Sequence, residues 1–175
     1  LVFATAWGAQ ALRRPAALAT DEASAVGVVE HFLSSLPGHV LAADPQVLYL
    51  QPTSPLRTAH HIDDALAGMA RAGATSVMSV VEMAQSPFKA FRLDAQGRLF
   101  SLFDERQSNM RRQDLPTCYL PNGAIYAFPA SAFRARGGFP SNGAWPYVMS
   151  EDDSLDIDAP SDLLRAAQLL GDRDG

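Results

Sequence analysis

The stretch Leu48-Tyr49-Leu50-Gln51-Pro52-Thr53-Ser54-Pro55-Leu56-Arg57 decides how we interpret the fold. A short apolar run ends in a polar turn, which two prolines stiffen because each fixes φ and removes a backbone donor. Inner strands of α/β sheets deliver side chains to a ligand at their carboxyl ends in this way. Gln51 is the first side chain after the run that can read a ligand by hydrogen bonds. An ordinary strand-to-helix loop would explain the same residues.

Length and composition indicate one globular domain. The chain has 175 residues, of which 47% are hydrophobic, and this is enough for a sizeable core. A formal net charge of −5 argues against nucleic acid or an anionic membrane as the main partner. No apolar run approaches the roughly 20 residues of a transmembrane helix, and no secretory signal is visible. A single cysteine, Cys118, fits the reducing cytoplasm, where we expect the protein, and its default interpretation is structural.

Helical and strand patterns alternate in the first half of the chain. Apolar residues recur at helical spacing from Glu22 to Leu36, after the start signature Thr20-Asp21-Glu22. Thr58 can cap a second helix, which ends near Gly73, and β-branched residues over 75–81 predict the next strand. Strand, helix and strand form a βαβ unit, so the sequence predicts parallel pairing with a right-handed crossover.

The middle of the chain interrupts this alternation. Residues 90–93 and 98–102 flank the turn Asp94-Ala95-Gln96-Gly97, which predicts a hairpin. A polar tract with little apolar content follows from Asp104 to Pro116. We therefore expect an insertion or arm, over about residues 86–121, that is attached to an α/β core.

Strand patterns return after the arm. Residues 122–128 read as a strand, 136–146 are loop-like, and Ser154-Leu155-Asp156-Ile157-Asp158 alternates as a short strand does. Pro160 suits the first turn of a final helix to Leu170.

Asp156 and Asp158 are the sharpest local feature. A spacing of two on a strand puts both carboxylates on one face, where they repel unless a cation lies between them. Mg²⁺ is held in this way, by one or two carboxylates together with substrate phosphates. Alternatively, both aspartates face water and cap the following helix.

Several other polar residues could bind a ligand. Lys89 and Arg111-Arg112 could clamp an anionic substrate, or they could be solvated charges on an exposed loop. Asn122-Gly123 offers an amide and a permissive backbone, which a tight turn would also explain. The sequence shows no histidine metal cluster, no Ser-His-Asp order and no basic glycine-rich phosphate loop.

Five motifs occur in order along the chain, and any one of them alone would be weak. They are Arg14-Pro15-Ala16-Ala17-Leu18-Ala19-Thr20-Asp21, Leu50-Gln51-Pro52-Thr53-Ser54-Pro55-Leu56-Arg57, Arg112-Gln113-Asp114-Leu115-Pro116, Asn122-Gly123-Ala124-Ile125-Tyr126 and Ser154-Leu155-Asp156-Ile157-Asp158. Together they give the chain, from about Arg14 to Leu170, a specific resemblance to the acylneuraminate cytidylyltransferases, also called CMP-sialic acid synthetases. The resemblance implies an α/β fold, namely a Rossmann-like nucleotidyltransferase three-layer sandwich with a mostly parallel sheet and a hairpin arm for dimerisation.

The resemblance also implies a reaction. CMP would pass from CTP to the anomeric hydroxyl of a nine-carbon α-keto acid sugar, such as N-acetylneuraminate, with release of pyrophosphate. Mg²⁺ would be the cofactor, and a homodimer would share its active sites. Legionaminate and pseudaminate are alternative sugars. A 3-deoxy-manno-octulosonate enzyme is a related alternative, against which the Asn122 to Tyr126 motif argues. A non-catalytic fragment that keeps sugar binding and dimerisation is the remaining hypothesis.

Individual side chains acquire roles from the same resemblance. Asp156 and Asp158 match the Mg²⁺ ligands and are the expected catalytic carboxylates. Gln51, Asn122 and Tyr126 match residues that would contact the sugar. Arg14 and Ser24 match residues that would contact the cytidine. Lys89 and Arg112, in the arm, match residues that would reach the active site of the partner subunit.

The chain also departs from the pattern of the family. An N-terminal strand and a basic, glycine-containing loop that wraps the CTP phosphates are not present in the sequence. We therefore expect residues 1–175 to form one cytidylyltransferase domain without that loop, with Val2–Thr5 matching at best the second strand of the family. Leu120 stands where many members carry a basic residue, and Ala25 stands where a second serine is common.

Overall fold

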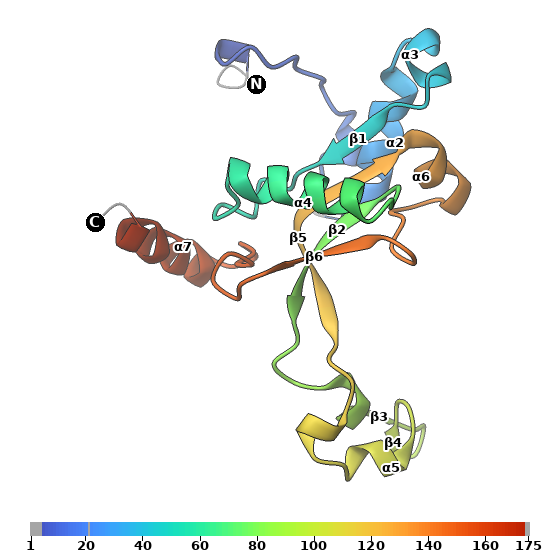
Figure 1. Ribbon diagram of the computed structural model, residues 1–175, viewed down its shortest axis with the longest axis vertical. Coiled ribbons are helices and arrows are strands. Elements are labelled where there is room, and N and C mark those ends of the chain that lie inside the picture. The colour runs from blue at the N-terminus through green and yellow to red at the C-terminus, as the bar shows by residue number, and fades with distance from the viewer. Residues whose placement is uncertain (1–4, 21, 174–175) are drawn as a thin grey trace.

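The computed structural model describes residues 5–20 and 22–173, so Asp21 and residues 2–4 of the segment matched to the second strand of the family lie outside the described residues. A four-stranded sheet forms the centre, and an arm projects from it (Figure 1). The elements in chain order are η1 (Ala16–Leu18), α2 (Ala25–Ser35), α3 (Gly38–Ala42), β1 (Gln46–Tyr49), α4 (Ala59–Arg71), β2 (Val77–Glu82), η2 (Pro87–Lys89), β3 (Phe91–Leu93), β4 (Leu99–Ser101), α5 (Glu105–Ser108), η3 (Arg112–Asp114), β5 (Tyr119–Pro129), α6 (Ala130–Arg136), β6 (Trp145–Met149) and α7 (Pro160–Arg173).

The sheet is mixed rather than mostly parallel, which corrects the prediction. Its strand order is β1-β5-β2-β6; β5 is antiparallel to both β1 and β2, and only β2 and β6 pair in parallel. β1, β2 and β6 share one direction, but β5 separates β1 from β2, so the predicted βαβ strands do not pair directly. The arm explains this arrangement: β2 leads out to it and β5 returns from it, so the two strands become antiparallel neighbours.

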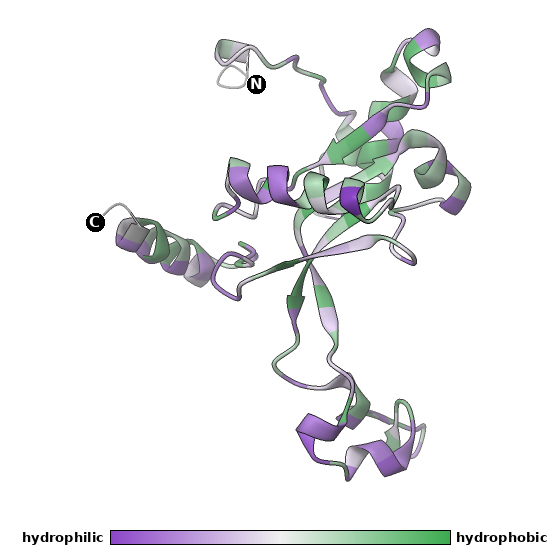
Figure 2. Ribbon diagram, in the orientation of Figure 1, coloured by the Kyte–Doolittle hydropathy of each residue, from purple (hydrophilic) through white to green (hydrophobic). Residues whose placement is uncertain are grey.

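Helices cover both faces of the sheet, in a three-layer arrangement such as the family resemblance implies. On one face, α2 and α6 pack on β1 and β5 through a core that contains Leu33, Phe128 and Phe133. On the other face, α4 packs through Ala65 against a second hydrophobic cluster, which contains Val77 of β2, Ile125 of β5 and Met149 of β6. Adjacent residues of β5 serve opposite faces, as Ala127 and Phe128 do, because side chains alternate along a strand. Figure 2 shows the apolar colouring of these strands and of the helix faces beside them.

Side-chain caps set where the two main core helices begin. Ser24 caps α2 by accepting a hydrogen bond from the backbone N–H of Gly27 at 3.1 Å, so this helix starts later than Glu22. Thr58 caps α4 as predicted. Its hydroxyl accepts from the N–H of His61, and the Thr58 N–H donates back to His61 Nδ1, both at 3.3 Å. This reciprocal capping box satisfies two backbone donors at the start of α4.

The predicted strand over 154–158 does not form. The N–H of Ser154 closes a turn onto Ser150, and the N–H of Asp158 donates to the Asp162 carboxylate at the start of α7. Between these two local bonds, the N–H of Ile157 bonds to the carbonyl of Thr53 at 2.9 Å. The segment is therefore fixed against the turn that follows β1 rather than incorporated into the sheet. The sequence also did not predict α6, and β6 begins inside the region that it marked as loop-like.

The arm contains the predicted hairpin. β3 and β4 pair antiparallel, with Phe91 opposite Ser101 and Leu93 opposite Leu99. Figure 1 shows the hairpin and α5 at the far end of the two long connections from β2 and β5. Many large apolar side chains of the arm are at least half exposed, which is unusual for a segment with no further contact. These residues are Leu93, Leu99, Phe100, Leu102 and Phe103.

Among the described residues, no helix combines the length and the hydropathy that a membrane span requires.

Gly68 of α4 tests the packing of this helix on β6. A Cβ at Gly68 would lie 2.6 Å from Nε1 of Trp145, so the indole would have to move. We expect Gly68→Ala to lower the free energy of unfolding, because overpacking costs about 1–3 kcal/mol and alanine returns at most about 1 kcal/mol of helix propensity. Urea titration followed by tryptophan fluorescence would measure both the stability and the displaced indole.

Gly171 of α7 provides the matched control, since a Cβ there meets no atom of the described residues within 4 Å. We expect Gly171→Ala to leave stability equal or slightly higher. If both alanine variants stabilised the protein equally, the close approach of α4 to Trp145 would be contradicted.

Candidate functional site

A cavity of about 350 Å³ lies where the turn after β1 meets β5 and the 154–156 segment. This volume is in the range of small-molecule sites. The cavity brings together four of the predicted site residues, namely Gln51, Asn122, Tyr126 and Asp156. Ser154 adds a fifth polar side chain. Val81, Leu120 and Pro121 form an apolar wall.

A bulge in β5 forms the back of this cavity. Met78 of β2 lies opposite Tyr126 and Val80 lies opposite Pro121, so Ser79 alone spans residues 122–125. Such bulges redirect side chains and are common beside functional sites. The Ser79 hydroxyl fills the gap: its Oγ lies 2.5 Å from Asn122 Oδ1 and accepts the N–H of Ile125 at 2.7 Å. The bulge is thus held by side-chain hydrogen bonds in place of strand pairing.

Gly123 lets the side chain of Gln51 lie against β5. Its φ of +77° is a left-handed conformation that favours glycine, and a Cβ there would overlap Oε1 of Gln51. Gly123 lies inside β5 and not in the tight turn that was the alternative interpretation of Asn122-Gly123. The half-buried amide of Gln51 is therefore held in one position at the cavity, as a group that recognises a ligand by hydrogen bonds must be.

Asn122 lines the cavity but uses its carboxamide internally. Oδ1 receives the Ser79 hydroxyl and the N–H of Ala124, and Nδ2 donates to Ser154 Oγ at 2.9 Å. Ser154 in turn donates to the carbonyl of Ser150 at 2.6 Å. Asn122 is 7% exposed, so these bonds satisfy a buried amide. The geometry gives it the role of a scaffold between β5 and the 150–154 turn.

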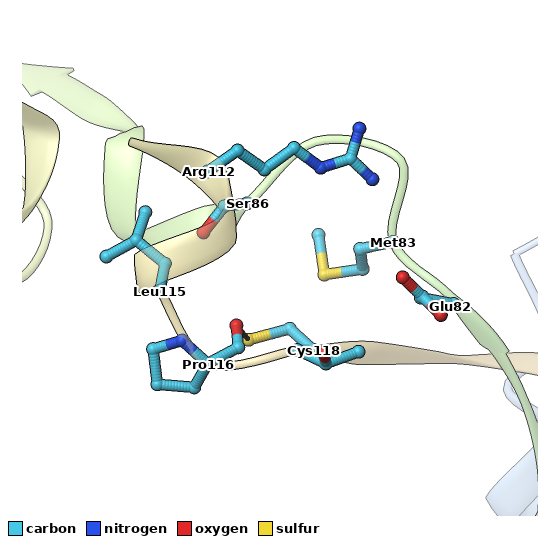
Figure 3. A pocket seen from close by; sticks show the side chains of 8 residues that line it. Glu82, Met83, Ser86, Arg112, Leu115, Pro116 and Cys118 are labelled. Carbon is cyan, nitrogen blue, oxygen red and sulfur yellow. Dashed lines mark hydrogen bonds between the residues drawn. The ribbon is translucent and has the colours of Figure 1, made fainter. Parts of the chain in front are cut away.

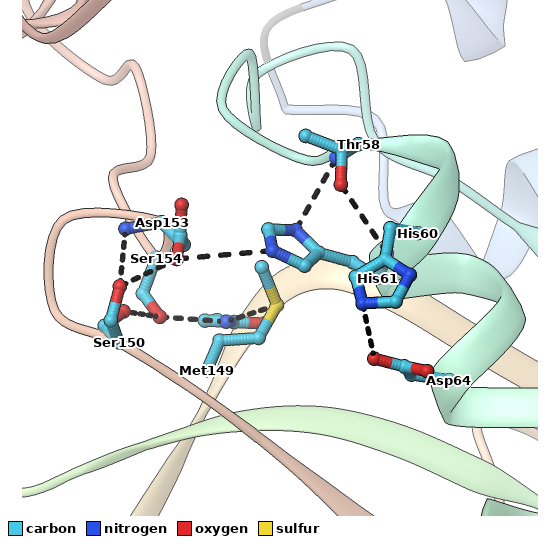
Figure 4. A network of polar contacts seen from close by, with 9 residues as sticks. Thr58, His60, His61, Asp64, Met149, Ser150, Asp153 and Ser154 are labelled. Carbon is cyan, nitrogen blue, oxygen red and sulfur yellow. Dashed lines mark hydrogen bonds and ion pairs between the residues drawn. The ribbon is translucent and has the colours of Figure 1, made fainter. Parts of the chain in front are cut away.

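Figure 4 shows the continuation of this network to α4. The Ser150 hydroxyl donates to Asp153 Oδ2 at 2.6 Å, and His61 Nε2 lies 3.8 Å from the same oxygen. The His61 ring also lies 6.3 Å from that of Tyr147 in β6. The turn that precedes Asp156 is therefore connected to both α4 and β5.

Asp156 presents an unsatisfied oxygen in the half-buried part of the site. Oδ1 of its carboxylate is buried and has no hydrogen-bond partner among the described residues. Burial, together with the charges of Tyr49 and Asp156, raises the pKa of the neighbouring Tyr126 phenol above its usual value. A buried carboxylate oxygen without a donor is suited to bind a cation or a ligand hydroxyl.

Asp158 lies apart from this cavity. Because 154–158 is not a strand, the expected single face with two carboxylates does not form; Asp158 is exposed and precedes α7. Its N–H and that of Ala159 donate to Asp162 Oδ2, so Asp162 caps α7. The part of the chain described contains no group of three or more histidine, cysteine or acidic residues placed to hold a metal. Asp156 nevertheless offers the hard oxygen that Mg²⁺ prefers.

The two residues expected on the cytidine side lie elsewhere. Arg14 lines a separate hollow of about 700 Å³ between α2, β1 and the N-terminal segment, together with Phe32 and Leu48. The Ser24 hydroxyl caps α2.

The two residues expected to act from the arm are exposed and lie outside the cavity. Lys89 ends η2, and Arg112 begins η3. Figure 3 shows the Arg112 side chain extending away from Leu115 toward Met83, at a small pocket where the arm joins the sheet. Cys118 lines the same pocket, and its thiol lies 3.6 Å from the carbonyl of Pro116.

Sequence reasoning missed three residues that build the site. Ser79 and Ser154 hold Asn122, and Arg57 donates from Nη1 to the carbonyls of Gln51 and Ala124, both at 2.9 Å. Burial lowers the pKa of the Arg57 guanidinium. A serine inside the apolar run of β2 was the available signal for Ser79, since a buried hydroxyl needs a partner.

Comparison with known proteins agrees with the motifs. No family model matches the chain. The N-acylneuraminate cytidylyltransferase of Escherichia coli O18:K1:H7 is 32% identical over 162 residues, that is 92% of this chain and 37% of the relative. The enzyme of the same name from Streptococcus agalactiae serotype V is 28% identical over 157 residues, or 90% of this chain. N-acylneuraminate cytidylyltransferase B of Danio rerio is 28% identical over 163 residues, or 93%.

The chain spans 37% of the length of each of these curated relatives. The resemblance identified from five motifs is confirmed: over about nine tenths of its residues the chain is similar to N-acylneuraminate cytidylyltransferases.

Proposed function

We propose that this chain is part of a cytidylyltransferase that transfers CMP from CTP to a nine-carbon α-keto acid sugar, and that it acts in the cytoplasm. The single observation that supports this most is the cavity beside β5, where Gln51, Tyr126 and Asp156 meet over a fixed backbone. The relatives bear the name of this activity. The polar wall of the cavity suits sugar hydroxyls, and the apolar wall suits an acyl or deoxy substituent.

In this reaction the anomeric hydroxyl oxygen forms a bond to the α-phosphorus of CTP, and the bond from that phosphorus to the bridging oxygen breaks. Pyrophosphate leaves with the electron pair, and the hydroxyl proton passes to a carboxylate oxygen of Asp156 or to water. Transfers of this kind depend on positioning and on charge stabilisation more than on covalent chemistry. Gln51 and Tyr126 would position the sugar, and Arg14 would contribute positive charge on the nucleotide side.

The proposal includes Mg²⁺, which the carboxylates of Asp156 and Asp158 would hold, although only Asp156 lines the cavity. Asp156 supplies the unpartnered buried oxygen, and triphosphate oxygens and water would complete the coordination, as is usual for this ion. A bound Mg²⁺ supplies charge neutralisation at the phosphates.

The arm supports a homodimer within the same proposal. Its exposed apolar residues need a cover, and a second copy of the chain provides one through a self-complementary interface. In such a dimer Lys89 and Arg112 would reach the partner's site, where their charges could hold the carboxylate of the sugar.

A second candidate is a sugar-binding protein without turnover. It is favoured by the lining of the cavity, where the described residues include the carboxylate of Asp156 but no lysine or arginine to neutralise a triphosphate. Pyrophosphate release separates the two candidates. With CTP and Mg²⁺, we expect release with N-acetylneuraminate, legionaminate or pseudaminate, and little with 3-deoxy-manno-octulosonate. Sugar binding without release from any of them would favour the second candidate.

The carboxylates provide a sharper test. We expect Asp156→Asn and Asp158→Asn each to reduce pyrophosphate release by at least about 100-fold, because each removes a charge near the triphosphate. The thermal midpoint should stay unchanged, since neither side chain accepts a described hydrogen bond. Asp152→Asn is the matched control, because Asp152 is exposed and pairs with Arg165 at 3.4 Å. Full activity in Asp156→Asn would contradict the metal assignment.

The proposed role of the arm in dimerisation is tested by measuring the oligomeric state of variants. We expect Leu99→Asp combined with Phe100→Asp to convert the dimer to monomer and to reduce turnover, because charges cannot be buried in an apolar interface without a partner. Light scattering would measure mass, and pyrophosphate release would measure activity. Ala95→Asp, in the turn of the same hairpin, should leave both unchanged. A wild-type monomer would rule out the dimer.

A further inference from the structure

The guanidinium of Arg57 lies behind the wall of the cavity and joins its two sides. Nη1 donates to the carbonyl of Gln51, in the turn after β1, and to the carbonyl of Ala124, in the bulge of β5, each at 2.9 Å. These are the two segments that meet where the Gln51 amide lies against Gly123. One nitrogen atom therefore fixes the distance between the two backbone segments that carry Gln51 and Gly123 at the cavity.

The contact has little tolerance for movement. Gly123 leaves no room even for a Cβ beside Oε1 of Gln51, so a shift of either backbone changes where that amide points. The Ala124 carbonyl lies in the bulge, where strand pairing with β2 is interrupted. Without the Arg57 donor this carbonyl would lose a partner on the side that faces β1.

The fold does not depend on Arg57 alone. Ser79 holds the opposite side of the bulge through Ile125 and Asn122, and β1 pairs with β5 from Gln46 to Tyr49. Loss of the Arg57 bonds should therefore loosen the alignment of Gln51 while the sheet stays formed. No described carboxylate forms an ion pair with this half-buried cation, so its partners are backbone oxygens of the site.

We propose that Arg57 is a positioning residue that sets the Gln51 amide against Gly123 and thereby determines how tightly the site holds its sugar acid. The sugar in this statement rests on the proposed function, whereas the alignment of Gln51 does not. Arg57 acts through Gln51 and Ala124 and need not touch the ligand itself.

The experiment compares Arg57→Met, which removes every donor, with Arg57→Lys, which keeps one charged donor. Arg98→Met is the control, because Arg98 is an exposed arginine paired with Asp94 in the arm. Calorimetry would measure the Kd for N-acetylneuraminate. NMR of the ligand-free protein would follow the side-chain amide of Gln51 and the backbone amide of Gly123.

We expect Arg57→Met to raise the Kd about tenfold, and Arg57→Lys to raise it less, because a charged hydrogen bond to a backbone oxygen is partly restored. The Gln51 and Gly123 resonances should shift in Arg57→Met while the resonances of α2 and α6 stay in place. Arg98→Met should change neither quantity. If Arg57→Met fails to fold, Arg57→Lys carries the test through the same resonances.

Two failures are distinguishable. If the wild-type protein binds no sugar acid, the proposed function fails, and the resonances of the ligand-free protein still test the alignment of Gln51. If the Arg57 variants leave the Gln51 and Gly123 resonances unchanged, or leave the Kd unchanged where binding is present, the positioning role is overturned.

Discussion

The hydroxyl of Ser79 is the contact on which the rest of the site depends. It lies in β2 opposite four residues of β5 and satisfies backbone and side-chain groups that strand pairing leaves open. Because unpaired buried polar groups are costly, the bulge exists only where such a partner is available. The Ser79 hydroxyl fixes the positions of Asn122, Gly123 and Ala124. Asn122 then holds the turn at Ser154 by a hydrogen bond. Arg57 completes the same structure from the side of β1.

Local signals in the sequence predicted the parts of the fold that depend on neighbouring residues. The Thr58 cap, the β3–β4 hairpin and the approximate positions of β1 and β2 all follow from short patterns. The path of β5 between β1 and β2 could not be predicted in this way, because it depends on where the chain returns after a long excursion. The strand expected over 154–158 failed for a related reason: alternation indicates an extended segment, but the backbone N–H groups of Ser154, Ile157 and Asp158 bond to Ser150, Thr53 and Asp162 and not to a strand.

The site shows the same division. Gln51, Tyr126 and Asp156 were found from motifs, and the structure gathers them in one cavity. Asn122 was found as well, but its polar groups face inward, which a motif cannot reveal. Arg57 and Ser79 were missed as functional residues because their partners are backbone atoms distant in sequence. Side chains that bind ligands carry recognisable chemistry, whereas those that support them are identified only by three-dimensional contacts.

The buried position of Asn122 affects how fast the protein degrades chemically. In a flexible chain, an asparagine followed by glycine ages readily: the glycine nitrogen attacks the side-chain amide, a succinimide closes and ammonia leaves. Within β5, however, the Asn122 amide is buried and held by Ser79, Ala124, Ser154 and Met149. The rotation needed for this attack would break all of these contacts. The packing that shapes the cavity thus also shields an intrinsically perishable pair of residues from deamidation.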